Sequence, residues 1–395
     1  MDPKYDRLYA AVDLSRIRGN LKNIKSSLAK GTGIIAVLKA DAYGHGSRVV
    51  ANYISDDIEM AGVAGVSEAL ELRKEMEGGK LYSPCFTKPI LVLGYSHPSM
   101  FEDAIANDVT LTVFDEANAK ELDKAARKAG KPADVHIAVD TGMHRIGFRP
   151  TDESVEAIRR ISKLKNLRIK GIFSHFARAD ETAGVSETDE QEKRFRSFCD
   201  KLSREGIDAG IRHISNSAAI MTGRTDYPLV RAGIVLYGNY PSGEMNKDLI
   251  ELQPSLSVRA RIVNVAALEK GESVSYGHTF TADKKMKIAT LAAGYADGIF
   301  RSLSNKGEVV ISGKRCRILG RICMDQMMAD VTEVENCSVG DEALIFGELD
   351  GAVLPIEEVA AKAGSFNYEL MCEIGRRMAR IYYENGMPVE TVNYI

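Results

Sequence analysis

The strongest constraint on the fold is an alternation of short apolar runs with segments of helical periodicity, from residue 14 to about residue 240. This pattern is typical of a parallel sheet whose strands are joined by crossover helices. We expect eight strands, at Ile34–Leu38, Ala61–Val66, Ile90–Leu93, Thr110–Phe114, Val135–Val139, Ile169–Ser174, Ile211–Ser215 and Leu229–Val235. Eight strand–helix repeats favour a TIM-type (β/α)8 barrel, with a doubly wound open sheet as the alternative.

The expected helices carry their own signals. In the first one the apolar side chains recur every three or four residues and therefore share one face: Leu14, Ile17, Leu21, Ile24 and Leu28. Asp13 precedes this run and can cap its first turn. We expect Asp115 and Ser67 to cap two later helices in the same way.

After Gly238 the pattern changes, because Pro241, Ser242 and Gly243 begin a linker that leads into short alternating strands. The expected strands are Ser257–Val265, Ile288–Ala292, Val309–Ser312, Cys316–Leu319, Met327–Val331 and Ala343–Phe346. Leu8–Val12 can join them as a further strand. The sequence therefore predicts a barrel domain at residues 14–240 and a mainly β domain formed by residues 1–13 and 241–395.

Composition excludes several classes of protein. A chain with 45% hydrophobic and 27% charged residues is an ordinary globular protein, and a net charge of -3 without a basic stripe argues against nucleic acid or an anionic membrane as partner. The six cysteines form no Cys-x-x-Cys pair, so we expect reduced thiols and no metal. The first residues are polar and no apolar run is long enough to span a bilayer, which predicts a cytoplasmic protein that acts on a small molecule.

Lys39 is the first candidate for chemistry. It follows a short apolar strand directly and enters a turn that contains Asp41, Tyr43, Gly44 and Gly46. A lysine at this place needs a charge partner or a chemical purpose such as a covalent imine. Taken alone, a lysine at this place is more often a solvated side chain at a strand end.

Polar residues also follow the later barrel strands, where barrel enzymes place their active sites. They are Asp140 and the loop 141–145, His175, Asn216 and Ser217, and the segment 230–234. Ser217, Gly233 and Ile234 lie where such barrels bind phosphate, although a plain loop with a helix cap is the alternative. With Lys39, these residues indicate a phosphorylated aldehyde held as an imine.

Seven motifs together resemble the alanine racemase family over nearly the whole chain. They lie at residues 36–46 (AVLKADAYGHG), 140–147 (DTGMHRIG), 174–180 (SHFARAD), 213–218 (HISNSA), 274–277 (VSYG), 294–298 (GYADG) and 323–327 (CMDQM). The resemblance implies an isomerase that uses pyridoxal phosphate to interconvert L- and D-alanine for cell-wall peptidoglycan. It also implies a homodimer with shared active sites.

By the same resemblance, Lys39 binds the cofactor and acts as one of two bases, and Tyr276 of the partner subunit is the other. Racemisation needs two such groups because the proton leaves one face of the α-carbon and returns to the opposite face. His175 would lie between that tyrosine and Arg231 and would stabilise phenolate character. Taken alone, a histidine on a strand is more often structural.

The resemblance places further residues around the cofactor. Tyr43, Asn216, Ser217, Gly233 and Ile234 would bind its phosphate. Arg231 would face the pyridine nitrogen and, being always protonated, could not pass a proton to it, which should suppress transamination. Without the resemblance, Arg231 could be a surface arginine at a helix start.

Arg145 would bind the cofactor's phenolic oxygen and the substrate carboxylate, and Met324 of the partner subunit would assist. Asp180, Tyr295, Arg301 and Arg321 match positions that line the entrance, where a solvated rim is the alternative. Asp325 can help to order the same layer.

Two residues depart from the family pattern. Ala138 stands where many members carry a carbamylated lysine that supports the arginine at position 145, and Arg376 stands where a tyrosine often touches the phosphate. Arg376 could still bind the phosphate or could point to solvent. The departures motivate a serine-preferring or broad-specificity racemase as the alternative. A decarboxylase and a non-catalytic pyridoxal-phosphate carrier are weaker rivals, because of Arg231 and the second domain respectively.

Overall fold

The computed structural model describes residues 7–74 and 85–394. It divides into two compact units, and each is described by itself. The barrel unit comprises Ile17–Ala42 and Ser47–Gln253, and the β unit comprises Met1–Arg16, Tyr43–Gly46 and Pro254–Ile395. Residues 1–6 of the predicted N-terminal segment lie outside the described residues.

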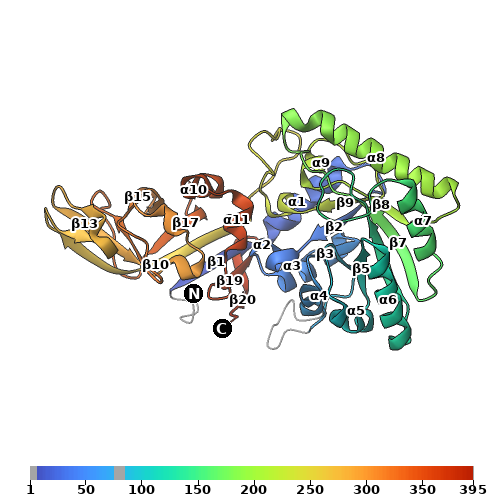
Figure 1. Cartoon of the computed structure of the whole chain (residues 1–395). Helices are drawn as coiled ribbons and strands as arrows, with labels where there is room; N and C mark the ends of the chain where they lie inside the picture. Colours follow the sequence, from blue (N-terminus) through green and yellow to red (C-terminus); the bar gives the residue numbers. More distant parts are fainter. Residues whose placement is uncertain (1–6, 75–84, 395) are drawn as a thin grey trace. The chain divides into compact units, whose positions relative to one another are not determined.

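The barrel unit contains the predicted eight parallel strands, in the order β8-β7-β6-β5-β4-β3-β2-β9 (Figure 1). They are β2 (Gly33–Val37), β3 (Met60–Val63), β4 (Ile90–Val92), β5 (Val109–Val113), β6 (Ala133–Ala138), β7 (Leu167–Phe173), β8 (Ile211–His213) and β9 (Leu229–Ala232). The amide of Arg231 on β9 donates to the carbonyl of Ser215, just past β8, at 2.9 Å. The sheet is therefore a nearly closed barrel, which confirms the predicted fold class.

Helices surround this sheet (Figure 1). They are α1 (Leu14–Ser27), α3 (Ser47–Tyr53), α4 (Val66–Arg73), α5 (Phe101–Ala106), α6 (Glu116–Ala129), α7 (Asp152–Ile161), α8 (Val185–Arg204) and α9 (Ser217–Met221). In α1, Ile17, Leu21 and Ile24 are buried, as their spacing predicts. The carboxylate of Asp13 accepts a hydrogen bond from the amide of Arg16 at 3.0 Å and so caps this helix.

One predicted cap is confirmed and another is wrong. Asp115 caps α6 by accepting from the amide of Asn118. Ser67 caps nothing, because α4 begins at Val66 and Ser67 already lies exposed within its first turn. Glu68 of the same turn reaches back instead, and its two carboxylate oxygens accept from the amides of Ala64 (2.6 Å) and Ala40 (2.8 Å).

The β unit is built on a sheet of order β18-β17-β14-β15-β16-β13-β10-β1-β19-β20. Its strands are β1 (Leu8–Asp13), β10 (Leu256–Leu268), β13 (Met286–Leu291), β14 (Glu308–Ile311), β15 (Lys314–Leu319), β16 (Met327–Asp330), β17 (Glu342–Leu349), β18 (Ala352–Leu354), β19 (Ala379–Glu384) and β20 (Met387–Val392). All six predicted strands are present. The N-terminal β1 joins them as expected, antiparallel to β10 and parallel to β19.

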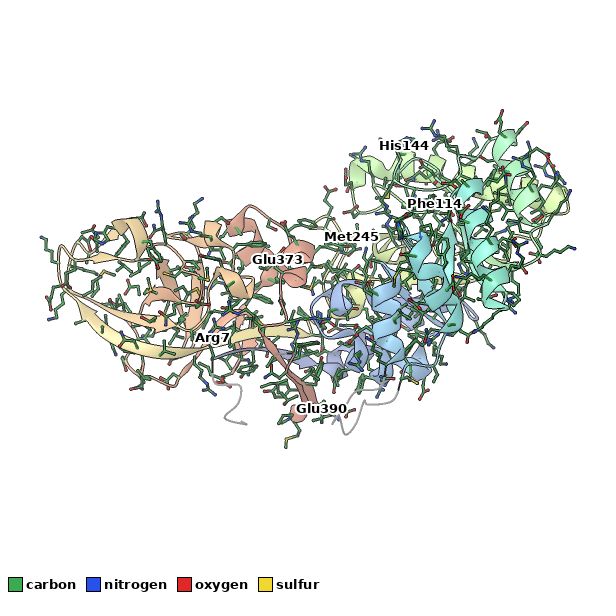
Figure 2. All side chains as sticks on the ribbon, turned by 60° about the horizontal axis from the view of Figure 1, so that its bottom comes forward. Arg7, Phe114, His144, Met245, Glu373 and Glu390 are labelled. Carbon is green, nitrogen blue, oxygen red and sulfur yellow. The ribbon has the colours of Figure 1, made fainter. Side chains whose placement is uncertain are left out.

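The end of the chain holds elements that the sequence did not predict. They include α10 (Ile356–Ala363), α11 (Asn367–Cys372) and the β19–β20 hairpin. Glu373 follows α11 and Glu390 lies on β20 (Figure 2). The strand β20 has no buried residue and contains Pro388, so its sequence lacks the alternation that identifies a half-buried strand.

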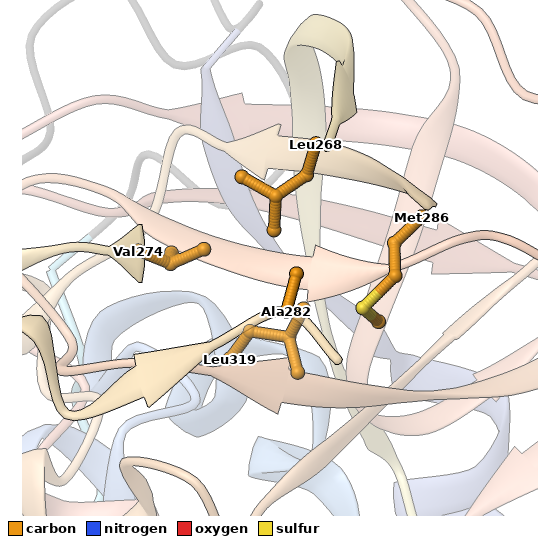
Figure 3. Close-up of a cluster of buried hydrophobic side chains, with 5 residues drawn as sticks. All are labelled: Leu268, Val274, Ala282, Met286 and Leu319. Carbon is orange, nitrogen blue, oxygen red and sulfur yellow. The ribbon is translucent and has the colours of Figure 1, made fainter. Parts of the chain in front are cut away.

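A small hydrophobic cluster supports a second short hairpin, formed by β11 (Ser273–Val274) and β12 (Phe280–Thr281). Its buried side chains are Leu268, Val274, Ala282, Met286 and Leu319 (Figure 3). Val274 belongs to this core and immediately precedes Ser275 and Tyr276. The loop that carries Tyr276 is therefore anchored at its base.

Within residues 7–74 and 85–394, every helix is too short or too polar to cross a bilayer.

Candidate active site

Lys39 begins a left-handed helical turn, α2 (Lys39–Tyr43). Ala40, Asp41 and Ala42 have φ values of 52°, 52° and 55°, and Tyr43 has a φ of 52°. This conformation costs roughly 1–2 kcal/mol for each residue with a Cβ, so other contacts must hold it. The carboxylate of Glu68 binds the amide of Ala40, and the carboxylate of Asp41 binds the amide of Ser47 at 2.7 Å. Strained backbone of this kind concentrates at functional sites.

Arg231 on β9 is buried, and polar groups of the barrel unit surround its side chain. Its guanidinium donates to the Nδ1 atoms of His213 (2.8 Å) and His175 (3.1 Å), and to the carbonyls of Ser174 and Ile214 (both 2.8 Å). None of these partners is a carboxylate. Burial lowers the pKa of Arg231 to about 9, and the neighbouring Arg145 adds to this shift. The side chain therefore stays charged at neutral pH without an ion pair.

The contacts of Arg231 determine the tautomers of its two histidines. A guanidinium can only donate, so the Nδ1 atoms of His175 and His213 must accept. Each neutral ring then carries its proton on Nε2. In His213 that proton is donated to Nδ1 of His136, 2.9 Å away and also buried. In His175 it is directed away from Arg231 and is available to a further partner.

Burial and the charges of nearby cations keep these histidines neutral. Burial and the charge of Arg231 lower the pKa of His213 well below its usual range and that of His136 to about 4. For His175, burial lowers the pKa most strongly, followed by the charges of Arg231, Arg145 and Lys39. The structure thus brings together four of the predicted site residues, Lys39, Arg145, His175 and Arg231. Three of them are cations, which suits an anionic ligand.

Four of the predicted phosphate-binding residues, Asn216, Ser217, Gly233 and Ile234, also lie together in the barrel unit. The amide of Gly233 donates to the hydroxyl of Ser217 at 3.0 Å, and Ile234 begins the short helix η5 (Ile234–Tyr237). Asn216 caps α9 by accepting from the amide of Ala219 at 3.0 Å. These contacts fix a hydroxyl and several backbone amides at the carboxyl ends of β8 and β9.

Arg145 is exposed, and the described residues give its side chain no hydrogen bond or ion pair. Its loop is instead shaped by the backbone, because the amide of Phe148 donates to the carbonyl of the buried Ala138 at 2.9 Å. Gly147 has a φ of 125°, and a Cβ there would lie 2.8 Å from the amide nitrogen of Asp140. His144 lies in the same loop (Figure 2). The loop therefore closes tightly over Ala138 without a lysine.

Gln191 on α8 is a site residue that the sequence did not indicate. Its buried amide donates to the carbonyl of His175 (3.0 Å) and accepts from the amide of Ala177 (2.9 Å). It also lies 3.4 Å from the hydroxyl of Thr141. Gln191 thus ties together the loops that follow β6 and β7. Within a strongly charged helix, nothing in the sequence distinguishes it from a solvated glutamine.

Asp180, the remaining predicted site residue of the barrel unit, is half-buried. Its backbone carbonyl accepts a hydrogen bond from the hydroxyl of Ser242 at 2.7 Å. Burial raises the pKa of the Asp180 carboxyl.

Tyr43, also predicted for this site, belongs to the β unit. It is buried, and burial raises its pKa above the usual value.

Tyr276 begins η6 (Tyr276–His278) in the β unit and is 70% exposed. The preceding Ser275 has φ 65° and ψ -175°, a region that only glycine adopts readily. The hydroxyl of Ser275 donates to the carbonyl of Arg321 at 2.5 Å, and the guanidinium of Arg321 lies against Gly277. Residues 275–278 and 323–326 line a cavity of about 650 Å³. A large aromatic side chain held on a strained loop beside a cavity is a candidate for contact with a partner.

In the same unit, Tyr295 is 42% exposed and Met324 is 52% exposed. The amide of Tyr295 donates to the carbonyl of Cys323 at 3.0 Å. Two arginines stabilise the backbone beside these residues. Arg7 binds the buried Asp297 through two hydrogen bonds, of 2.9 and 2.6 Å, and Arg377 binds Asp325 at 2.7 Å. Arg301 and Arg376 are exposed in this unit as well.

Within residues 7–74 and 85–394, no group of three or more His, Cys, Asp or Glu side chains could hold a metal ion.

Comparison with known proteins assigns both units to one family. The chain matches the family models "Alanine racemase, N-terminal domain" at residues 12–241 and "Alanine racemase, C-terminal domain" at residues 255–382. It is 42% identical to an alanine racemase of Clostridium novyi over 391 residues, which are 98% of each chain. It is 43% identical to one of Methanococcus maripaludis over 377 residues, 95% of this chain and 98% of the relative.

Solved structures agree in fold. An alanine racemase of Clostridium difficile 630 matches with a TM-score of 0.91 at 40% identity, over 98% of this chain and 99% of the other. One of Bacillus anthracis with bound L-Ala-P matches with a TM-score of 0.91 at 34% identity, over 99% of each chain. With matches of this extent in both sequence and structure, the chain belongs to the alanine racemase family.

Proposed function

We propose that this chain is a pyridoxal-phosphate-dependent racemase that interconverts L- and D-alanine by a two-base mechanism. The observation that carries the proposal is the buried guanidinium of Arg231, which has two neutral histidines and no carboxylate among its partners and shares its surroundings with Lys39. When bound, pyridoxal phosphate supplies an electron-withdrawing ring that acidifies the α-C–H bond of an amino acid linked to it.

The residues present fit this cofactor. Lys39 would bind it covalently, and Arg231 would donate to its pyridine nitrogen. Ser217, Gly233 and Ile234 would hold the phosphate, and the Gly233–Ser217 hydrogen bond sets their proximity. We assign Tyr43, Asn216 and Arg376 to the same phosphate. Arg145 and His175 would contact the cofactor from the cationic cluster.

Arg231 decides the reaction type. Because a guanidinium at neutral pH only donates, it holds the ring nitrogen without transferring a proton to it. Proton exchange at the α-carbon is then favoured over transamination. A decarboxylase, which would place a carboxylate at this position, does not fit the partners of Arg231.

Two groups would move the α-proton, the amine of Lys39 and the hydroxyl of Tyr276 of the partner subunit. Each serves one face of the α-carbon. The Nε2 proton of His175, directed away from Arg231, would donate to the phenolate oxygen of the partner subunit's Tyr276. A hydrogen bond to the phenolate oxygen favours the charged form, so this donor would support Tyr276 of the partner subunit in its role as a base.

The proposed dimer follows from the β unit. Tyr276 and Met324 line one cavity and are exposed, and Tyr295 is exposed as well, although aromatic and apolar side chains of this size are usually covered. We propose that residues 14–240, together with Arg376 of the same chain, bind the cofactor, and that the mainly β domain at residues 241–395 and 1–13 also contributes to the active site of a second copy. Arg145 would then bind the substrate carboxylate beside Met324 of the partner subunit. Asp180, Tyr295, Arg301 and Arg321 would line the entrance.

The proposed role is the supply of D-alanine for peptidoglycan in the cytoplasm, and it rests on the family alone. A serine-preferring or broad-specificity racemase is the second candidate, because Ala138 and Arg376 change the support of Arg145 and the charge of the pocket. Comparison of kcat/KM for alanine and serine decides between them.

Exchange in deuterated water tests the mechanism. Wild type should exchange the α-proton of both alanine enantiomers. The Lys39→Ala and Tyr276→Phe variants should fail asymmetrically, each losing exchange mainly from the enantiomer whose proton that group removes. Tyr95→Phe, which alters another exposed tyrosine, is the matched control and should behave as wild type.

The same experiment can overturn the proposal. If Tyr276→Phe exchanged and racemised both enantiomers like wild type, the two-base assignment would be wrong. Cofactor absorbance without any exchange into alanine would instead indicate a carrier. Release of carbon dioxide from basic amino acids would indicate a decarboxylase.

A further inference from the structure

The turn at Tyr43–Gly46 is enclosed by the C-terminal part of the β unit. Gly44 and Gly46 have φ values of 78° and 90°. A Cβ at Gly44 would lie 2.3 Å from the carbonyl oxygen of Met371. At Gly46 a Cβ would lie 1.8 Å from the hydroxyl of Tyr382 and 3.1 Å from that of Tyr394. Two tyrosine hydroxyls thus approach the backbone of this turn so closely that only glycine fits.

Arg380 joins the turn to the segment that carries Arg376. Its buried guanidinium donates to the carbonyls of Gly44 (3.0 Å), Gly375 (2.7 Å) and Ile374 (2.8 Å), and also to that of Met378. A guanidinium that bridges several carbonyls fixes them relative to one another. The backbone around Arg376 and the backbone after Tyr43 are therefore held by the same side chain.

Tyr394 covers both arginines. It follows β20, the strand that carries Glu390 (Figure 2). The centre of its ring lies 5.0 Å from the guanidinium carbon of Arg380 and 5.9 Å from that of Arg376. A ring face at these distances attracts a cation and desolvates part of it. One aromatic ring from the end of the chain thus contacts the buried arginine that holds the turn and the exposed arginine beside it.

We propose that Tyr394 is a positioning residue for the Tyr43 turn, and that it thereby controls how tightly the protein binds the phosphate of its cofactor. The inference rests on the proposed function, in which Tyr43 and Arg376 bind that phosphate. Tyr394 acts through Arg380, which holds Gly44, and through Arg376, whose side chain it orients. The aromatic face of Tyr394 carries this effect.

Binding of two aldehydes by the full-length protein, after removal of bound cofactor by dialysis, tests this role. Dissociation constants for pyridoxal 5'-phosphate and for pyridoxal without phosphate are measured by absorbance. Tyr394→Leu, which keeps the bulk but removes the ring face, should weaken binding of the phosphorylated aldehyde by about fivefold or more and leave pyridoxal within about twofold. Tyr394→Phe should restore most of the affinity. Met387→Ala, which alters an exposed side chain on β20 shortly before Tyr394, is the control and should match wild type.

The outcomes separate this inference from the proposed function. If wild type bound neither aldehyde, the proposed function would fail. If wild type bound both but Tyr394→Leu changed neither constant, or weakened both equally, the positioning role of Tyr394 alone would be overturned. Equal weakening is what a merely structural tyrosine produces.

A double-mutant cycle tests the part assigned to Arg376. Because Tyr394 orients Arg376, the loss in the combined Arg376→Gln and Tyr394→Leu variant should be smaller than the product of the two single losses. A combined loss equal to that product would show that the two residues act independently and would overturn this part of the inference.

Discussion

At the scale of single residues, the chemistry depends on which nitrogen of His175 carries the proton. Arg231 settles this, because its donor at 3.1 Å occupies Nδ1 and leaves the proton on Nε2. The same arginine fixes His213, whose Nε2 proton passes to His136. A single buried cation therefore orients three imidazole rings, and its charge adds to burial in lowering the pKa of each.

His175→Ala should reduce kcat by roughly 10²–10³, the usual loss when one aligned donor is removed from a developing charge. His175→Gln keeps a donor and should lose less. Because the pKa of His175 is lowered well below 6.5, wild type should show no ionisation of this group between pH 6 and about 8 in kcat/KM. The measurement is the pH profile of racemisation for the three proteins. A limb near 6.5 that disappears in both variants would contradict the neutral assignment.

At the scale of elements, the barrel strands could be predicted because most of them are buried apolar runs between helices. The site residues that follow strand ends, such as Lys39, His175 and Ser217, could be found for the same reason. His136 inside a strand and Gln191 on a long helix could not, because they acquire their roles only through tertiary contacts. The left-handed turn after Lys39 was also beyond prediction, because alanine and tyrosine disfavour it intrinsically.

That turn yields a prediction at the element scale. Glu68→Ala removes the carboxylate that binds the amides of Ala40 and Ala64, and charge-assisted bonds of this kind contribute about 1.5–3 kcal/mol. We expect the free energy of unfolding to fall by about that amount. Glu71→Ala on the same helix breaks only surface pairs with Arg48 and Lys74 and should cost less than about 1 kcal/mol. Urea unfolding of the two variants measures the difference, and equal losses would mean that Glu68 does not hold the turn.

At the scale of the whole molecule, the chain separates the two proposed bases between its two units. Lys39 belongs to the barrel unit and Tyr276 to the β unit, where it is mostly exposed. The strained Ser275 and the cluster around Val274 hold the Tyr276 loop in place without covering the ring. An exposed ring on a firmly held loop is suited to enter the active site of another copy of the chain.

Mixing two inactive variants tests this arrangement. In a dimer of one Lys39→Ala chain and one Tyr276→Phe chain, a shared site leaves one of the two sites with both native bases. Random exchange makes half of the dimers mixed, so activity should return to about one quarter of wild type. If both bases came from one chain, every site would keep a defect and mixing would restore nothing. The measurement is racemisation before and after the two proteins are allowed to exchange subunits, with each protein incubated alone as the control.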